Sequence, residues 1–171
     1  MTLPRTLALA VLVLAIAAAS TARAQEPDLI FRKSTVLKLL SPDHKLATYG
    51  IDDPLVEGVA CHFTVPEKGG WTGYLGIAEE VSDISIACRQ IGPVRFTEKF
   101  GQGSEMFRRR RSALFKKMQI VRGCDTTRNV LVYLVYTDKL IEGSPKNSTS
   151  TVPISPWGGE PAPRCADWLA E

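Results

Sequence analysis

The amino-acid sequence predicts a mainly β protein: a single antiparallel β-sandwich or partly closed barrel, with one or two short helices and an irregular C-terminal tail. Three observations lead to this prediction. Several short stretches alternate apolar and polar residues with the period of two that a half-buried strand requires. Clusters of turn-forming residues separate these stretches. Strand-like and helix-like segments do not alternate along the chain, as they would in a doubly wound α/β protein.

Residues 1–24 are predicted to be a cleavable secretory signal peptide. Arg5 supplies a short positive region, residues 7–19 are an unbroken apolar run, and Ala22-Arg23-Ala24 fits a cleavage site before Gln25. The apolar run is shorter than the roughly 20 residues that a membrane-spanning helix needs. We therefore expect an exported mature chain without a transmembrane segment, with one domain over residues 25–157 and a Pro/Gly-rich tail over 158–171.

Seven segments are expected to be strands: 31–39, 45–51, 59–65, 84–91, 105–111, 114–122 and 130–137. In the third, Cys61, Phe63 and Val65 lie at alternating positions and should share the inward face. The last segment is apolar on both faces, which predicts a central position in its sheet. Residues 125–129 are turn formers, so the last two strands should form a hairpin.

Two regions depart from the strand pattern. Residues 69–76 are glycine-rich, which fits either a tight connection or a backbone-lined ligand pocket, and residues 77–83 could form a short helix. After Gly143, recurring prolines and glycines predict an irregular chain that wraps the domain without adding a layer.

The four cysteines are Cys61, Cys88, Cys124 and Cys165. An even number behind a signal peptide predicts disulfides, for which three pairings are possible. None of the spacings is C-x-x-C, so neither a thioredoxin-like redox site nor a zinc finger is indicated.

The overall charge argues against a nucleic-acid partner. The chain has 21 Lys and Arg against 18 Asp and Glu, and removal of Arg5 and Arg23 with the signal peptide brings the two nearly into balance. The charge is unevenly placed, since residues 25–90 are net acidic and residues 91–171 net basic, a pattern that gives a weak indication of an anionic partner.

A basic segment is the main candidate for ligand binding. It consists of Arg108, Arg109, Arg110, Arg111, Lys116 and Lys117, with Arg122 following close behind. Such residues could hold the phosphate or carboxylate groups of envelope glycans or lipids. The alternative, which is favoured, is a solvated strand whose charges protect a sheet edge. If the strands are neighbours, Lys116 and Arg122 should share one face and Lys117 the other.

No motif commits the chain to a reaction, and no catalytic residue, metal site or cofactor is predicted. His44 and His62, together with Asp43, Asp52 and Asp53, have no spacing typical of metal ligands, and the three aspartates fit turn capping better. The sequence contains no G-x-S-x-G. Trp71, Trp157 and Trp168 could line a sugar site, but side chains of this type more often pack.

An ordered series of segments resembles the CreA family of small periplasmic proteins of Gram-negative bacteria. The series is Ser41–Lys45, Asp52–Pro54, Val59–Cys61, Gly73–Glu80, Ser85–Cys88, Gln90–Pro93, Phe115–Lys117, Val121-Arg122, Tyr136–Lys139 and Glu142–Asn147. The resemblance extends from about Ile30 to Trp157. It implies a periplasmic location, but it brings no catalytic residues and no established molecular activity.

The resemblance also bears on the disulfides. Cys61 and Cys88 match the family pattern and occupy mid-strand positions, so we predict that they pair with each other. Cys124 and Cys165 depart from the pattern, and we predict that these two also pair with each other, which would pin the tail to a hairpin end.

Two functions remain open at this point. The first is a non-enzymatic binding or accessory protein of the cell envelope, bound to an envelope component or a periplasmic protein. The second is a periplasmic enzyme with an unrecognised active site acting on an anionic substrate. A deep polar cleft that gathers Asp43, His44, Asp52 and arginines would favour the enzyme, and a shallow basic surface would favour the binding protein.

Overall fold

A computed structural model describes residues 26–34, 44–68, 84–110, 117–137 and 146–171. The strands are β1 (Asp28–Ser34), β2 (His44–Asp53), β3 (Val56–Lys68), β4 (Ser85–Phe96), β5 (Ser104–Arg110), β6 (Lys117–Asp125), β7 (Val130–Thr137) and β8 (Asn147–Pro153), and a 3₁₀ helix, η1, spans Cys165–Trp168. They form two antiparallel sheets with the orders β1-β2-β3-β4 and β5-β6-β7-β8.

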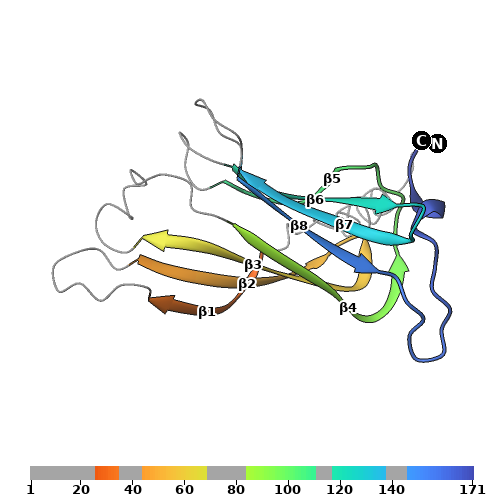
Figure 1. Ribbon diagram of the computed structural model, residues 1–171, viewed down its shortest axis with the longest axis horizontal. Helices are drawn as coiled ribbons and strands as arrows, with labels where there is room; N and C mark the ends of the chain where they lie inside the picture. Colours follow the sequence, from red (N-terminus) through yellow and green to blue (C-terminus); the bar gives the residue numbers. More distant parts are fainter. Residues whose placement is uncertain (1–25, 35–43, 69–83, 111–116, 138–145) are drawn as a thin grey trace, which may run out of the picture.

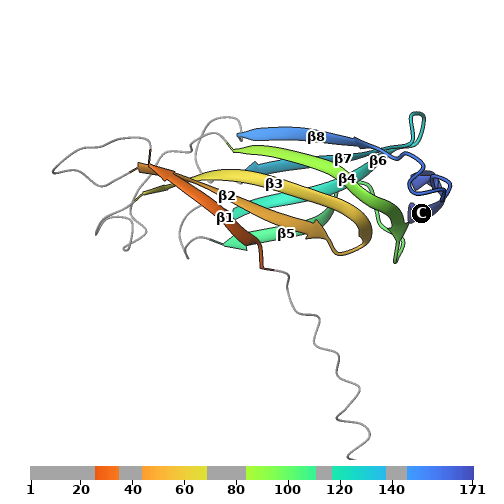
Figure 2. The same ribbon diagram turned by 90° about the horizontal axis from the view of Figure 1, so that it is seen from below.

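The two sheets are two layers around one core. Figure 1 shows β1–β4 as the lower layer and β5–β8 as the upper layer, and Figure 2 shows the same layers from below. Inward residues of both sheets join a single buried cluster, for example Phe63 of β3 with Phe107 of β5, whose ring centroids are 6.0 Å apart. The mainly β prediction is confirmed. The described strand pairings form two separate sheets and no closed barrel.

Within the described residues, each of the seven predicted strands is present, because the inward and outward residues alternate as expected; residues 35–39, 111 and 114–116 of these predictions lie outside the described residues. Cys61, Phe63 and Val65 are buried while His62 is exposed. The predicted hairpin is β6–β7, and β7 lies inside its sheet with a strict alternation of buried and half-buried residues. The short helix expected at 77–83 and the glycine-rich stretch at 69–76 lie outside the described residues.

The prediction of an irregular chain after Gly143 is wrong for β8. This strand pairs with β7 along its length, with Ser150 opposite Tyr133 and Val152 opposite Leu131. Ser150 and Val152 are both buried. The alternation is hard to recognise in the sequence because one of the two inward positions is a serine rather than an apolar residue.

Ser150 is buried because it joins the two sheets at one side. Its hydroxyl oxygen accepts a hydrogen bond of 2.8 Å from the backbone N–H of Cys88 in β4. Beside it, the Gln90 side-chain amide donates to the carbonyl oxygen of Ser155 and accepts from its N–H, both at 3.0 Å. The edges of β4 and β8, which lie side by side in both views, are therefore held together by side chains.

Both predicted disulfides are present. Cys61 and Cys88 stand directly opposite each other on β3 and β4, with their Cα atoms 4.0 Å apart. Cys124 of β6 is joined to Cys165 of η1 across a Cα distance of 5.9 Å.

The C-terminal segment packs against the sheets through specific contacts. The Asn129 side chain accepts a hydrogen bond of 2.9 Å from the N–H of Cys165 and donates one of 3.0 Å to the carbonyl oxygen of Pro163. The Trp168 ring stacks on Phe96 with centroids 5.5 Å apart. Together with the second disulfide, these contacts fix residues 163–168 at the end of the two layers.

Gly58 should be intolerant of any side chain. Its φ is +79°, and a Cβ atom there would lie 2.3 Å from the carbonyl oxygen of Pro93 on the neighbouring strand. We expect Gly58→Ala to lower the free energy of unfolding by about 2–4 kcal/mol, from the left-handed backbone and the steric clash together. The matched control is Gly103→Ala, which has a φ of +72° but no atom within 4 Å of the added Cβ. Equal losses for the two variants in urea denaturation would show that the clash has no effect.

Candidate functional site

The basic segment lies where β5 ends and β6 begins. Arg108, Arg109 and Arg110 are the last residues of β5, and Lys117 is the first residue of β6. The antiparallel register sets Arg108 opposite Gln119, Arg109 opposite Met118 and Arg110 opposite Lys117. The predicted strand neighbours are therefore confirmed, while Arg111 and Lys116 lie outside the described residues.

Arg108 already has partners within the sheet. Its guanidinium group forms an ion pair with Glu105, three residues earlier on β5, and donates a hydrogen bond of 3.3 Å to the Gln119 side-chain oxygen. That oxygen also accepts a hydrogen bond of 3.2 Å from the Tyr136 hydroxyl. Arg108 is thus held in place on the sheet while 39% of its side chain stays exposed.

The backbone register also sets two basic residues opposite each other, Arg110 on β5 and Lys117 on β6. Directly opposed like charges on neighbouring strands are destabilising.

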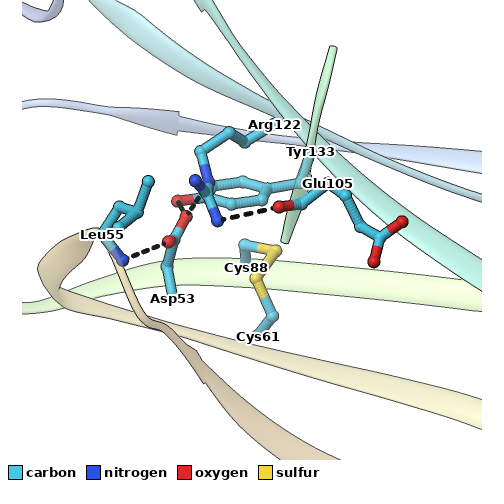
Figure 3. Close-up of polar contacts among 7 residues, drawn as sticks. All are labelled: Asp53, Leu55, Cys61, Cys88, Glu105, Arg122 and Tyr133. Atoms are coloured by element: carbon cyan, nitrogen blue, oxygen red, sulfur yellow. Dashed lines mark hydrogen bonds and ion pairs between the residues drawn. A yellow bond between two sulfur atoms is a disulfide. The ribbon is translucent and has the colours of Figure 1, made fainter. Parts of the chain in front are cut away.

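Arg122 does not belong to this basic surface. It follows the basic segment closely in the sequence, but its side chain is only 1% exposed, and its Nε donates a hydrogen bond of 2.8 Å to Oδ2 of Asp53 (Figure 3). Its Nη2 lies 3.5 Å from the carbonyl oxygen of Glu105. The Arg122 guanidinium group therefore lies in the core and joins β6 of one sheet to β2 of the other.

Asp53 is the centre of this buried polar cluster. Its Oδ2 also accepts a hydrogen bond of 3.0 Å from the Tyr133 hydroxyl, and its Oδ1 accepts one of 2.9 Å from the N–H of Leu55. The expected turn-capping role of Asp53 is thus confirmed. Figure 3 shows the three side chains of Asp53, Arg122 and Tyr133 converging next to the Cys61–Cys88 disulfide.

Burial dominates the electrostatics of the cluster. Removal from water raises the pKa of Asp53 above its ordinary value of 3.8, against the opposing effects of Arg122, the Leu55 N–H and the Tyr133 hydroxyl. Burial, and next the charge of Asp53, raise the pKa of Tyr133 as well. A carboxyl group with a raised folded pKa binds its proton more tightly when folded, so acid does not destabilise the protein through Asp53.

Sequence reasoning could have found the inward position of Arg122. On β6, Met118, Ile120, Arg122 and Cys124 alternate, and all four are buried. The strand period therefore marks Arg122 as inward. The position of its partner 69 residues away could not be read from that period.

The other predicted polar candidates are not brought together. Asp52 is exposed while Asp53 is buried, and His62 is exposed on the outer face of β3. His44 is the first residue of β2, and Asp43 lies outside the described residues. Among the residues that the structure describes, no group of three or more His, Cys, Asp or Glu is placed to hold a metal ion.

The described aromatic candidates have separate environments. Trp157 is 44% exposed, Trp168 packs against Phe96, and Trp71 lies outside the described residues.

A mostly apolar hollow of about 280 Å³ lies over β6 and β7. It is lined by Gln102, Gly103, Val121, Arg122, Gly123, Cys124, Asp125, Val132 and Leu134.

In the part of the chain that the structure describes, there is no helix with the length and apolar character needed to cross a membrane. The signal-peptide prediction falls on residues 1–24, outside the described ranges.

Comparisons with known proteins agree with the resemblance seen in the sequence. A family model described as "CreA protein" matches residues 30–157, which include β2–β8 and most of β1 but not η1. Protein CreA of Escherichia coli strain K12 is 45% identical over 127 residues, covering 72% of this chain and 81% of that protein. The CreA proteins of E. coli O6:H1 strain CFT073 and of E. coli O157:H7 match with the same values. No solved structure matches.

Proposed function

The chain belongs to the CreA family, and from that premise we propose that it is a non-enzymatic binding protein of the bacterial cell envelope. It acts in the periplasm and binds an anionic envelope component through its basic segment. Two disulfides support an oxidising compartment, because such bonds persist in secreted and periplasmic proteins. The apolar run and A-x-A site within residues 1–24 supply the export signal.

The observation that carries the binding proposal is the direct pairing of Arg110 with Lys117. Like charges at directly opposite positions of neighbouring strands repel each other, and a bound anion would offset this repulsion. Edge protection alone needs only a charged strand, and the neighbouring Arg108 already supplies one. The like-charge pair is therefore better accounted for by a ligand than by edge protection.

The chemistry of the segment points to phosphate or carboxylate groups. Arginine presents a planar fork of donors that matches either group with two parallel hydrogen bonds. The segment lies on an edge strand and its hairpin partner, and salt screens charges at a protein surface over about 10 Å at 0.1 M. Binding should therefore be weak and strongly dependent on ionic strength.

The test uses two anionic probes, vesicles containing phosphatidylglycerol and the soluble glycan heparin. The purified protein should bind both probes at low salt, and both should dissociate as sodium chloride is added. Arg110→Ser/Lys117→Ser should weaken binding about tenfold, equivalent to roughly 1.4 kcal/mol. The control, Arg95→Ser/Arg128→Ser, removes the same charge from two arginines that are paired elsewhere, with Glu160 and Asp125.

The two double variants separate a site from a general charge effect. A local site predicts a loss in the first variant only. Equal losses in both would show that overall charge is responsible, and wild-type binding by Arg110→Ser/Lys117→Ser would show that the segment only protects a solvated edge.

A further inference from the structure

Strand β1 exposes an unusual amount of apolar surface. Leu29, Ile30 and Phe31 are consecutive and are 43%, 53% and 55% exposed, and Leu46 on the adjacent strand β2 is 39% exposed. All seven residues of β1 are exposed. Single exposed apolar side chains are ordinary on protein surfaces, but a contiguous group on one strand is typical of an interaction surface.

β1 is also an edge strand whose outer side is covered by no strand and no side-chain bridge among the described residues; its pairing with β2 shifts in register between Leu29 and Phe31, and its basic residues lie at one end only. The edges of β4 and β8 are joined by Ser150 and Gln90, as described above. The edge of β5 ends in three consecutive arginines, and charged side chains discourage strand addition. β1 has a paired strand, β2, on one side only. Its other side presents backbone donors and acceptors beside apolar side chains, which is the arrangement that accepts an added strand.

The strand is held in a defined position on its sheet. Arg32 forms an ion pair of 2.8 Å with Glu67 at the end of β3, across the intervening strand β2. Ile30 packs over Gly50, where an added Cβ atom would lie 3.3 Å from its terminal carbon. A preorganised edge loses little conformational freedom when a partner strand docks.

The charges of β1 indicate what the partner is. Asp28 stands at the start of the strand, Arg32 and Lys33 stand towards its end, and the apolar residues lie between them. Antiparallel alignment of two such strands brings each Asp28 near the Arg32 and Lys33 of the other copy, with apolar residues in contact at the centre. Opposite charges across neighbouring strands are stabilising.

We propose that β1 pairs antiparallel with β1 of a second copy of this chain, forming a two-fold symmetric dimer with one continuous eight-stranded sheet. The contact is isologous, so each copy uses its β1 edge and the assembly closes at two. Because the other three edges are joined or charged, the dimer does not extend into a filament. This inference is independent of anion binding by the basic segment, which lies on the other sheet.

The first experiment measures the oligomeric state of the purified protein by analytical ultracentrifugation over a range of concentrations. The wild type should be a dimer that dissociates on dilution. Phe31→Lys should raise the dissociation constant at least about tenfold. The control, Ile91→Lys, changes an isoleucine of β4 that is 59% exposed and should leave the dimer unchanged. Circular dichroism should show an intact fold in both variants.

The second experiment tests the charge arrangement. Asp28→Arg and Lys33→Asp should each weaken self-association, because each places like charges across the two-fold axis; Arg32 is left unchanged because it pairs with Glu67 in its own chain. An equimolar mixture of the two variants should recover dimers. In the mixed dimer, the arginine introduced at position 28 faces the aspartate introduced at position 33, and the native Asp28 faces the native Lys33. Recovery in the mixture cannot result from damage to either chain alone.

Three results would overturn the proposal. They are a monomeric wild type at every concentration, a dimer that Phe31→Lys leaves intact, and no recovery in the mixture. A monomer that instead binds phosphatidylglycerol vesicles, and loses them on Phe31→Lys, would identify a lipid surface as the occupant of β1.

Discussion

Replacing Arg122 with methionine should lower the free energy of unfolding by about 3–5 kcal/mol, because it leaves the buried carboxylate of Asp53 without its cation. Methionine keeps the apolar stem of the side chain, so the loss reports mainly on the charge. The ion pair joins the two sheets at 2.8 Å and its side chains are 1% and 0% exposed. The control is Arg128→Met, in an exposed ion pair with Asp125, which should change stability very little because water and salt screen the pair. Urea denaturation measures both.

The pH dependence of the Arg122→Met variant has a defined sign. Loss of the cation removes an effect that lowers the pKa of Asp53, so burial raises this pKa further above 3.8. The folded variant then binds a proton more tightly than the unfolded chain, and its stability falls as the pH rises from about 3.8 towards the raised value. The difference in free energy of unfolding between Arg122→Met and the wild type should therefore be smallest in acid.

A double variant identifies the source of the loss. Asp53→Asn/Arg122→Met removes both charges, while the introduced asparagine can still accept the hydrogen bond from the Leu55 N–H. It should be more stable than Arg122→Met at neutral pH and should lack the pH dependence. A double variant as unstable as the single one would show that packing, and not the unpaired charge, dominates.

Removing the Cys61–Cys88 disulfide should destabilise the protein by roughly 3–4 kcal/mol in the chain-entropy description of a closed loop. The two cysteines are separated by 27 residues, and both are fully buried. In Cys61→Ala/Cys88→Ala the melting temperature should fall, and amide hydrogen exchange should accelerate across β3 and β4, since the bond joins the centres of these strands.

The second disulfide is the matched comparison. Cys124 and Cys165 are separated by 41 residues, so the entropic contribution is similar. In Cys124→Ala/Cys165→Ala, however, faster exchange should be confined mainly to the C-terminal segment. The hydrogen bonds of Asn129, the Trp168 ring contact and the backbone hydrogen bonds to Phe100 remain there, but the covalent link is lost. Identical exchange patterns in the two double variants would contradict these separate roles.

Much of the fold follows from the sequence because strand alternation is a local property. The positions of Cys61, Phe63 and Val65 identify an inward face without knowledge of what covers it. The turn residues between 114–122 and 130–137 likewise predicted the β6–β7 hairpin. β8 was missed because its inward position 150 is a serine, whose burial depends on the Cys88 N–H.

The candidate site was predicted less completely. The sequence located the basic segment, but the pairing of Arg110 with Lys117 depends on the register shift between Glu105 and Phe107 in β5. One extra residue at such a bulge changes every subsequent cross-strand partner. A register of this kind is settled by packing and not by composition.

The sequence by itself determined the mainly β class and the alternating faces, which depend on residue types at short spacing, and the family, which depends on an ordered series of motifs. It left three cysteine pairings open, and the pairing was predicted only with the help of the family resemblance. Only the tertiary structure decided that Arg122 meets Asp53 in the core, 69 residues away, and that β1, among the described residues, is an edge strand with exposed apolar side chains. The physical reason is that alternation specifies which face a side chain takes within its own sheet. Which residues of the facing sheet it then meets is set by how the two layers stack.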